Sequence, residues 1–215
     1  MIWRLFLLSS LAVTYSYDLN QVVFVILSQT GRRHEDIAQE TREKLTKVLR
    51  EDGVEEPQIF DLHNDWRMTG GWSIFPLLPL LDQVSKPGTK WYVFLNEASE
   101  INVPVFKEVL LQYTSDYGIL VGRSLKDHNV EFPDALAGFL MSKELLSNLL
   151  VEHNERNFEI LQRVTHDAAF FLSVAIKHLA SFLENDPRFC ISFEDGCAIY
   201  PRDVSCKTSK EAATR

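Results

Sequence analysis

A cluster of polar and acidic residues directly follows an apolar segment in the middle of the chain. Trp91–Leu95 has the length and composition of a buried strand. The polar residues that follow this segment are Asn96, Glu97, Ser99 and Glu100. Because the carboxyl ends of parallel strands border the ligand crevice in an open α/β sheet, these side chains lie where ligand chemistry is usually found. The alternative is a strand end capped by solvated polar residues that bind nothing.

Two histidines invite a catalytic or metal-binding interpretation. His34 and His166 each lie alone in a polar segment. For an isolated histidine, a surface or helix-capping role is more common than proton transfer or metal ligation. We therefore expect neither to do chemistry.

The cysteines gather in the last part of the chain. They are Cys190, Cys197 and Cys206. In an oxidising compartment, three cysteines predict one disulfide and one remaining thiol, and the sequence leaves the pairing open. Zinc binding is disfavoured, since the spacings are not those of ligand pairs and no histidine lies nearby.

The first seventeen residues have the order of a secretory signal peptide. Arg4 precedes the apolar stretch Leu5–Val13, and small or polar residues follow it. We expect cleavage near Tyr17, which places the mature chain in the lumen of the secretory pathway, with an uncleaved anchor as the alternative. No later segment reaches the roughly eighteen uninterrupted apolar residues of a membrane span.

Composition favours one soluble domain. The chain has 215 residues, 46% of them hydrophobic and 24% charged, which is enough for one full core and few for two. The formal net charge of -8 argues against a nucleic-acid partner, because phosphate binding requires a cationic surface.

Apolar runs and helical periodicities alternate along the chain. The predicted strands are Gln21–Leu27, Ile59–Leu62, Trp91–Leu95, Gly118–Gly122 and one that begins near Leu136. The predicted helices are Ile37–Leu49, Val103–Tyr113, Lys143–Val151 and Thr165–Leu183. Trp72–Val84 must be buried, and Pro76 and Pro79 predict that any helix there starts late or is irregular. This order predicts a three-layer α/β domain with a mostly parallel sheet over residues 18–186, and a cysteine-bearing tail over 187–215.

Several blocks in this order resemble a known family. They are VVFVILSQT, GGWSIFPLLPLL, KWYVFLNEASEINVPVF, FPDALAGFLMSKELLSNL and THDAAFFLSVAI. Together they resemble the fringe-like glycosyltransferases, inverting enzymes of the β-1,3-transferase group with a GT-A-type fold. Within this group the chain resembles most the N-terminal half of two-domain members that add glucose to O-linked fucose on thrombospondin type 1 repeats. The resemblance covers roughly residues 20–206 and implies that a second domain, with an intact acidic motif, follows the tail.

The resemblance also implies roles for individual residues. In active members the strand matching Trp91–Leu95 ends in an acidic motif that holds a divalent metal, such as Mn²⁺, against the diphosphate of the UDP-glucose donor. Here that motif reads Asn96-Glu97-Ala98, which leaves Glu97 as the one candidate metal ligand. Asp167 stands where the family places its general base, although a carboxylate there could equally stabilise a helix N-terminus. Gly138 matches a glycine-rich turn on the acceptor side, and Trp66 could stack on a sugar ring or fill the core; Trp72 is expected in the core.

Three hypotheses about function remain open at this stage. The first is a metal-poor, non-catalytic domain of a β-1,3-glucosyltransferase of the endoplasmic reticulum, which helps bind an O-fucosylated acceptor. The second is an active single-domain transferase that uses Glu97, Glu100 and Asp167. The third is a lumenal module that binds sugar or protein in the manner of a lectin or chaperone.

Overall fold

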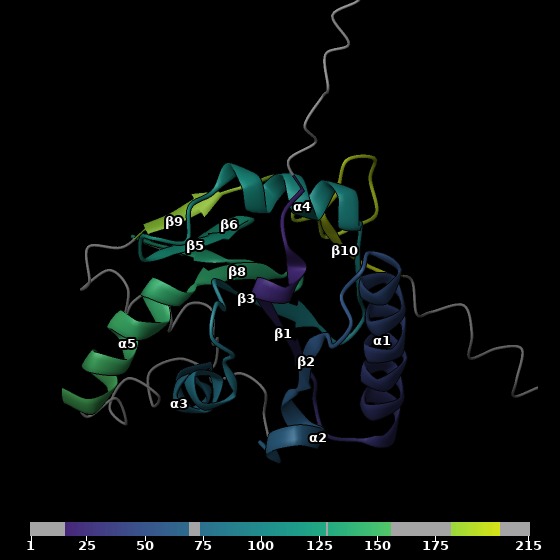
Figure 1. Ribbon diagram of the computed structural model, residues 1–215, viewed down its shortest axis with the longest axis horizontal. Coiled ribbons are helices and arrows are strands. Elements are labelled where there is room, and N and C mark those ends of the chain that lie inside the picture. The colour runs from purple at the N-terminus through teal and green to yellow at the C-terminus, as the bar shows by residue number, and fades with distance from the viewer. Residues whose placement is uncertain (1–15, 69–73, 128, 156–181, 203–215) are drawn as a thin grey trace, which may run out of the picture.

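A six-stranded sheet forms the centre of the domain (Figure 1). The computed structural model describes residues 16–68, 74–127, 129–155 and 182–202. The strand order is β2-β1-β3-β8-β5-β9. These strands are β1 (Val22–Leu27), β2 (Gln58–Asp61), β3 (Trp91–Asn96), β5 (Ile119–Gly122), β8 (Phe139–Ser142) and β9 (Phe182–Asn185). Only β8 runs antiparallel to its neighbours in this sheet, so the prediction of a mostly parallel sheet is confirmed.

Helices cover both faces of the sheet (Figure 1). On one face lie α1 (Arg32–Glu51) and α4 (Val103–Gln112). The other face carries α2 (Leu62–Trp66), α3 (Ile74–Val84) and α5 (Lys143–Glu155). The predicted three-layer α/β architecture is confirmed.

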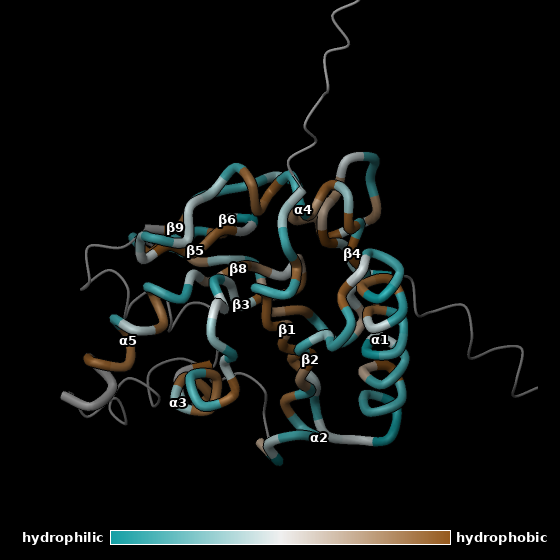
Figure 2. Tube along the Cα trace, in the orientation of Figure 1, coloured by the Kyte–Doolittle hydropathy of each residue, from teal (hydrophilic) through white to brown (hydrophobic). Residues whose placement is uncertain are grey.

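The apolar central strands explain this sandwich. Along β1, Val22 and Phe24 pack into the core on the α1 side, whereas Val23 and Val25 pack into the core on the α3 side. Successive side chains of a strand point to opposite faces, so an unbroken apolar run is buried when both faces are covered. Figure 2 shows the hydrophobic colour concentrated along β1, in contrast to the mostly hydrophilic outer surface of α1.

Helix α1 connects the edge of the sheet with its flank, so its bounds matter for the site. Its buried residues are Ala38, Thr41, Leu45 and Leu49, which share one face at helical spacing. The helix begins at Arg32, earlier than predicted, because its first turn is polar and carries no apolar signal. It ends before Gly53, whose φ of 94° allows the Val54 N–H to bond the Leu49 carbonyl at 3.0 Å.

The proline-containing helix α3 is more regular than its sequence predicts. It is helical from Ile74 to Val84 with Pro79 inside it. Pro76 lies in the first turn, where backbone N–H groups have no partner within the helix, so its missing donor costs little there.

The predicted helix Thr165–Leu183 is wrong at its C-terminal end. Phe182 and Leu183 belong to β9, where they pair with Ile119 and Leu120 of β5. Pairing with a neighbouring strand overrides the helical periodicity of this short stretch. Residues 165–181 lie outside the described part of the chain.

The segment after Asp186 packs on the domain. Phe189 and Ile199 are fully buried, and β10 (Ile199–Pro201) pairs antiparallel with β4 (Ser99–Ile101). The predicted boundary after Asp186 therefore lies inside the folded unit. A second small ladder, which the sequence did not predict, joins β6 (Ser124–Asp127) and β7 (Val130–Pro133).

Cys190 and Cys197 form the disulfide, and Cys206 lies outside the described residues.

Among the residues that the structure describes, no helix is both long enough and apolar enough to cross a membrane.

Candidate active site at the carboxyl edge of the sheet

Three neighbouring strands end together at one edge of the sheet. In the register of the sheet, Leu27 of β1 pairs with Asn96 of β3, and Ile26 of β1 pairs with Asp61 of β2. Ser28, Asp61 and Glu97 therefore follow adjacent strand ends. We call this region the carboxyl edge, and it is where open α/β sheets bind ligands.

Both oxygens of the Glu97 carboxylate have partners within the chain. One accepts a hydrogen bond from the Gln29 backbone N–H at 3.4 Å, and the other contacts Nδ1 of His34. The Thr41 hydroxyl donates to the Glu97 carbonyl at 2.6 Å and fixes the turn from the side of α1. The Glu97 side chain is only 12% exposed, so His34 is a partner of Glu97 rather than the isolated surface histidine that the sequence predicts.

The residues of the Asn96-Glu97-Ala98 motif do not fit a divalent metal ion. Such an ion needs several oxygen ligands, ideally more than one carboxylate. Asn96 uses its side-chain oxygen to accept the Ala98 N–H at 3.1 Å, and Glu97 is engaged by His34 and Gln29. Within the described ranges, no three His, Cys, Asp or Glu side chains lie close enough to hold a metal together.

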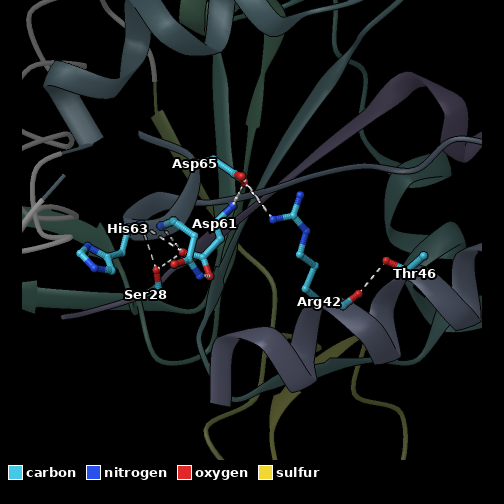
Figure 3. Close-up of polar contacts among 7 residues, drawn as sticks. Ser28, Arg42, Thr46, Asp61, His63 and Asp65 are labelled. Carbon is cyan, nitrogen blue, oxygen red and sulfur yellow. Dashed lines mark hydrogen bonds and ion pairs between the residues drawn. The ribbon is translucent and has the colours of Figure 1, made fainter. Parts of the chain in front are cut away.

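Asp61 is the centre of a second closed network at the same edge (Figure 3). Its carboxylate is 1% exposed and accepts hydrogen bonds from the backbone N–H groups of His63 and Asn64, at 3.0 and 3.1 Å. It also accepts the Ser28 hydroxyl. These bonds cap helix α2 and join the ends of β1 and β2. Ser28 donates to the aspartate and not to a histidine ring, so the group is not a nucleophilic triad.

Asp65 connects this network to α1. Its carboxylate accepts the Asp61 backbone N–H at 2.7 Å and pairs with Arg42 at 3.1 Å (Figure 3). Nε2 of His63 lies 3.5 Å from Glu35, while its Nδ1 is buried and has no hydrogen-bond partner in the described structure. Among the described residues of this network, His63 therefore has a buried polar atom without a partner.

The two other predicted site residues that the structure describes, Trp66 and Gly138, make packing contacts. Trp66 stacks on Phe60, with ring centroids 5.1 Å apart, and packs partly into the core. Gly138 is buried, and a Cβ there would lie 3.0 Å from the Phe94 carbonyl oxygen, so its observed role is close packing. Asp167, His166 and Trp72 lie outside the described residues.

Sequence reasoning missed Ser28, Asp61 and His63. The rule that selected Glu97, a polar residue just after a buried strand, applies equally to Asp61 at the end of β2. Asp61 lies inside the predicted strand Ile59–Leu62, so the sequence does not mark it as a residue that follows a strand.

Comparisons with known proteins agree with this architecture. The chain is 27% identical over 147 residues to human beta-1,3-glucosyltransferase, covering 61% of this chain and 30% of that protein. It is 26% identical over 156 residues to the mouse beta-1,3-glucosyltransferase, covering 66% of this chain and 32% of the relative. The aligned region thus spans about a third of the length of these curated relatives. No protein-family profile matches the chain.

A solved structure shares the fold. The crystal structure of a glycosyltransferase involved in glycosylation of the major capsid of PBCV-1 superposes with a TM-score of 0.51, covering 88% of this chain and 96% of that one. At 12% identity this likeness shows the fold alone. Together the sequence and fold matches confirm the resemblance to the fringe-like glycosyltransferases: the chain is similar in sequence to β-1,3-glucosyltransferases and has the fold of a GT-A-like glycosyltransferase.

Proposed function

We propose that the chain is a fringe-like domain of a β-1,3-glucosyltransferase that helps to bind the acceptor and does not itself transfer sugar. The observation that carries this proposal is the engagement of Glu97. The only carboxylate of the expected metal motif is held by His34 and by the Gln29 backbone. Without a divalent cation, this edge lacks the group that usually neutralises a diphosphate leaving group in such enzymes.

The acceptor in this proposal is O-linked fucose on thrombospondin type 1 repeats. The similarity to β-1,3-glucosyltransferases supports it, since it is the acceptor that the family resemblance implies. UDP-glucose and a divalent metal would be used by the full-length enzyme outside the described residues. The Cys190–Cys197 disulfide supports an oxidising compartment, consistent with the lumen of the endoplasmic reticulum.

The alternative of an active single-domain transferase requires Glu97, Glu100 and Asp167. Glu100 is paired with Lys44 at 2.8 Å, so both described acids already have cationic or basic partners. The geometry therefore favours the non-catalytic domain.

A binding experiment tests the proposed role. Beads carrying a folded thrombospondin type 1 repeat, with or without O-linked fucose, are incubated with the disulfide-intact chain. We expect greater recovery on the fucosylated beads. Equal recovery on both would contradict an acceptor-reading role.

A transfer assay tests the second half of the proposal. The fucosylated repeat is incubated with UDP-glucose, Mn²⁺ and the chain, and its mass is measured, with full-length human beta-1,3-glucosyltransferase as the positive control. We expect no added hexose. A hexose added by the wild-type chain but not by Glu97→Gln would establish the active transferase instead.

A further inference from the structure

A cavity lies on the flank of the domain, between α1 and the small β4–β10 sheet. It has a volume of about 320 Å³. Its principal lining residues are Lys44, Leu45, Val48, Ser99, Glu100 and Tyr200. We call it the flank pocket. Its lining includes neither Glu97 nor Asp61, but it includes Thr41, which bonds the Glu97 carbonyl, so the pocket borders the carboxyl edge.

The flank pocket contains a buried hydroxyl without a partner. Ser99 is 4% exposed, and its Oγ makes no hydrogen bond within the described structure. A buried polar group without a partner is costly, so such a group is usually satisfied by a ligand or an ordered water. The Ser99 Oγ has less than 1 Å² of accessible surface, so a ligand in the pocket reaches it only if the lining moves, and Lys44, Glu100 and Tyr200 are the polar side chains that the ligand meets first.

The charges of the lining cancel one another. Lys44 pairs with Glu100 at 2.8 Å, and Lys47 lies 4.0 Å from Glu51. All four line the pocket, so neither an anionic nor a cationic ligand meets an unmatched charge. Burial raises the pKa of the Tyr200 hydroxyl and the neighbouring Glu100 carboxylate raises it further, so Tyr200 is a neutral donor and acceptor at physiological pH.

The pocket joins an apolar wall to a polar rim. Leu45, Val48 and Ile101 form the wall, while Lys44, Glu100 and Tyr200 supply hydrogen-bonding groups. A pyranose ring has a complementary surface, with C–H groups on its faces and hydroxyls at its edge. The volume is at the lower end of the roughly 300–1,000 Å³ of small-molecule sites, which suits a single ring.

The segment that carries Tyr200 is held in place on both sides. Arg202 donates to the Ile37 carbonyl of α1 at 3.0 Å and pairs with Glu40 at 2.9 Å. The ring of Phe193, within the loop closed by the Cys190–Cys197 disulfide, packs edge-on against Tyr200 with centroids 4.9 Å apart. A pocket held in this way loses less entropy when it binds a ligand.

We propose that the flank pocket binds one neutral sugar ring, either a free monosaccharide or the terminal residue of a glycan. The proposal concerns this pocket alone and does not require the acceptor role proposed above. The pocket would hold the ring by its apolar face, with the hydroxyls bonded to Tyr200 and the Lys44–Glu100 pair.

The first test is a titration followed by the backbone amide NMR shifts of the disulfide-intact chain. The probes are methyl α-fucoside and methyl β-glucoside, with cyclohexanol as a ring of similar size that lacks most hydroxyls. We expect one of the glycosides to bind with a Kd of about 1–10 mM and to shift amides that line the pocket, and cyclohexanol to bind at least about tenfold more weakly. Glycoside binding no tighter than that of cyclohexanol, or shifts confined to other regions, would overturn the proposal.

Variants locate the binding site. Val48→Trp fills the cavity and should weaken glycoside binding by at least about tenfold, and Tyr200→Phe should weaken it about threefold to tenfold by removing one hydrogen bond. Glu43→Gln, on the exposed side of α1, is the matched control and should leave the Kd unchanged. Thermal unfolding verifies that each variant folds; if folded Tyr200→Phe and Val48→Trp both bind as tightly as wild type, the assignment is wrong.

Two further probes distinguish the sources of the ring. A short peptide bearing the same sugar should bind more tightly than the methyl glycoside if the natural ligand is the end of a glycan, and equally if it is a free monosaccharide. UDP-glucose should gain nothing over methyl glucoside, because the lining has no spare positive charge for a diphosphate. Tighter binding of UDP-glucose in this pocket would refute the neutral-ligand argument.

Discussion

The carboxyl edge and the flank pocket lie on the same domain, and α1 contributes to both, yet their polar groups are used in opposite ways. At the edge, the carboxylates of Asp61 and Glu97 accept hydrogen bonds from their own chain. In the flank pocket, the side chains of Tyr200 and Glu100 are partly exposed at the lining of an open cavity.

This difference shows that a glycosyltransferase fold can be present while the acids at its ligand-binding edge have a structural role. The carboxyl edge has the strand ends at which a glycosyltransferase fold binds its ligands. The carboxylates of Asp61 and Glu97, however, form hydrogen bonds within the chain and stabilise the loops at these strand ends. A buried acid with its hydrogen bonds satisfied contributes to stability, whereas partly exposed polar groups around a cavity can bond a ligand. The two regions therefore predict different consequences of substitution.

The largest expected effect is at Gly138, which packs between β3 and β10. A Cβ there would lie 3.0 Å from the Phe94 carbonyl oxygen and 3.1 Å from Ile199 of β10, and the φ of 75° disfavours a β-branched residue. We expect Gly138→Val to lower the free energy of unfolding by about 4 kcal/mol, measured by urea denaturation.

A second glycine separates the two causes. Gly88 also has a positive φ, of 91°, but nothing lies within 4 Å of a Cβ added there. Gly88→Val should therefore cost only about 1–2 kcal/mol, the backbone contribution alone. Equal losses in the two variants would show that crowding at Gly138 is unimportant.

Removing the buried acid of the edge is the next largest change. Asp61→Ala leaves the Ser28 hydroxyl and the N–H groups of His63 and Asn64 without their acceptor. We expect a loss of about 3 kcal/mol in unfolding free energy. Asp65→Ala, at an exposed position, is the control with an expected loss of about 1 kcal/mol; a loss as small as this for Asp61→Ala would mean that the edge network is not structural.

Opening the disulfide tests how the flank is held. In the double variant Cys190→Ser/Cys197→Ser, the loss of the cross-link over this short loop should lower the free energy of unfolding by about 2 kcal/mol. Cys206→Ser controls for the loss of a cysteine and should leave stability unchanged. An unchanged stability of the double variant would indicate that β4–β10 pairing alone fixes the segment.

The smallest effect should appear as a dependence on pH at the start of the same segment. Burial alone would raise the pKa of Asp186, but hydrogen bonds and charge from Arg188 outweigh it and hold the pKa below the usual value. A lowered native pKa stabilises the fold above the unfolded pKa of about 3.9, and this contribution disappears as the pH falls through the native value. The stability difference between wild type and Asp186→Asn should therefore be constant from pH 7 to about 5 and shrink below about pH 4.

The β-branched and aromatic strands were the part of this molecule that could be predicted from sequence. Val22–Leu27 and Trp91–Asn96 are continuous apolar runs, and both are central strands of the predicted sheet. The three-residue strands β4 and β10 were missed because a stretch of that length carries no periodic signal. Their pairing depends on a contact across the domain, between Ile101 and Ile199.

The position of the candidate site could be predicted from the sequence, but the hydrogen-bond partners of its residues could not. The rule about strand ends located Glu97 correctly at the carboxyl edge. Its partner His34 is separated from it by 63 residues, and nothing near either residue announces the contact. The disulfide pairing stayed open for a different reason: Cys190 and Cys197 are close in sequence, but three cysteines allow more than one pair.

The central claim is that Glu97 is engaged by His34 and Gln29 and does not bind a metal ion. It is tested most directly by calorimetric titration of UDP into the disulfide-intact chain, with and without Mn²⁺. We predict that Mn²⁺ adds no UDP binding, and that wild type, Glu97→Ala and His34→Ala give the same result, since a freed Glu97 would still be a single carboxylate. The contrary result would be that UDP binds the wild type only with Mn²⁺ and that Glu97→Ala loses this binding. It would contradict the claim and show that the carboxyl edge binds a donor nucleotide.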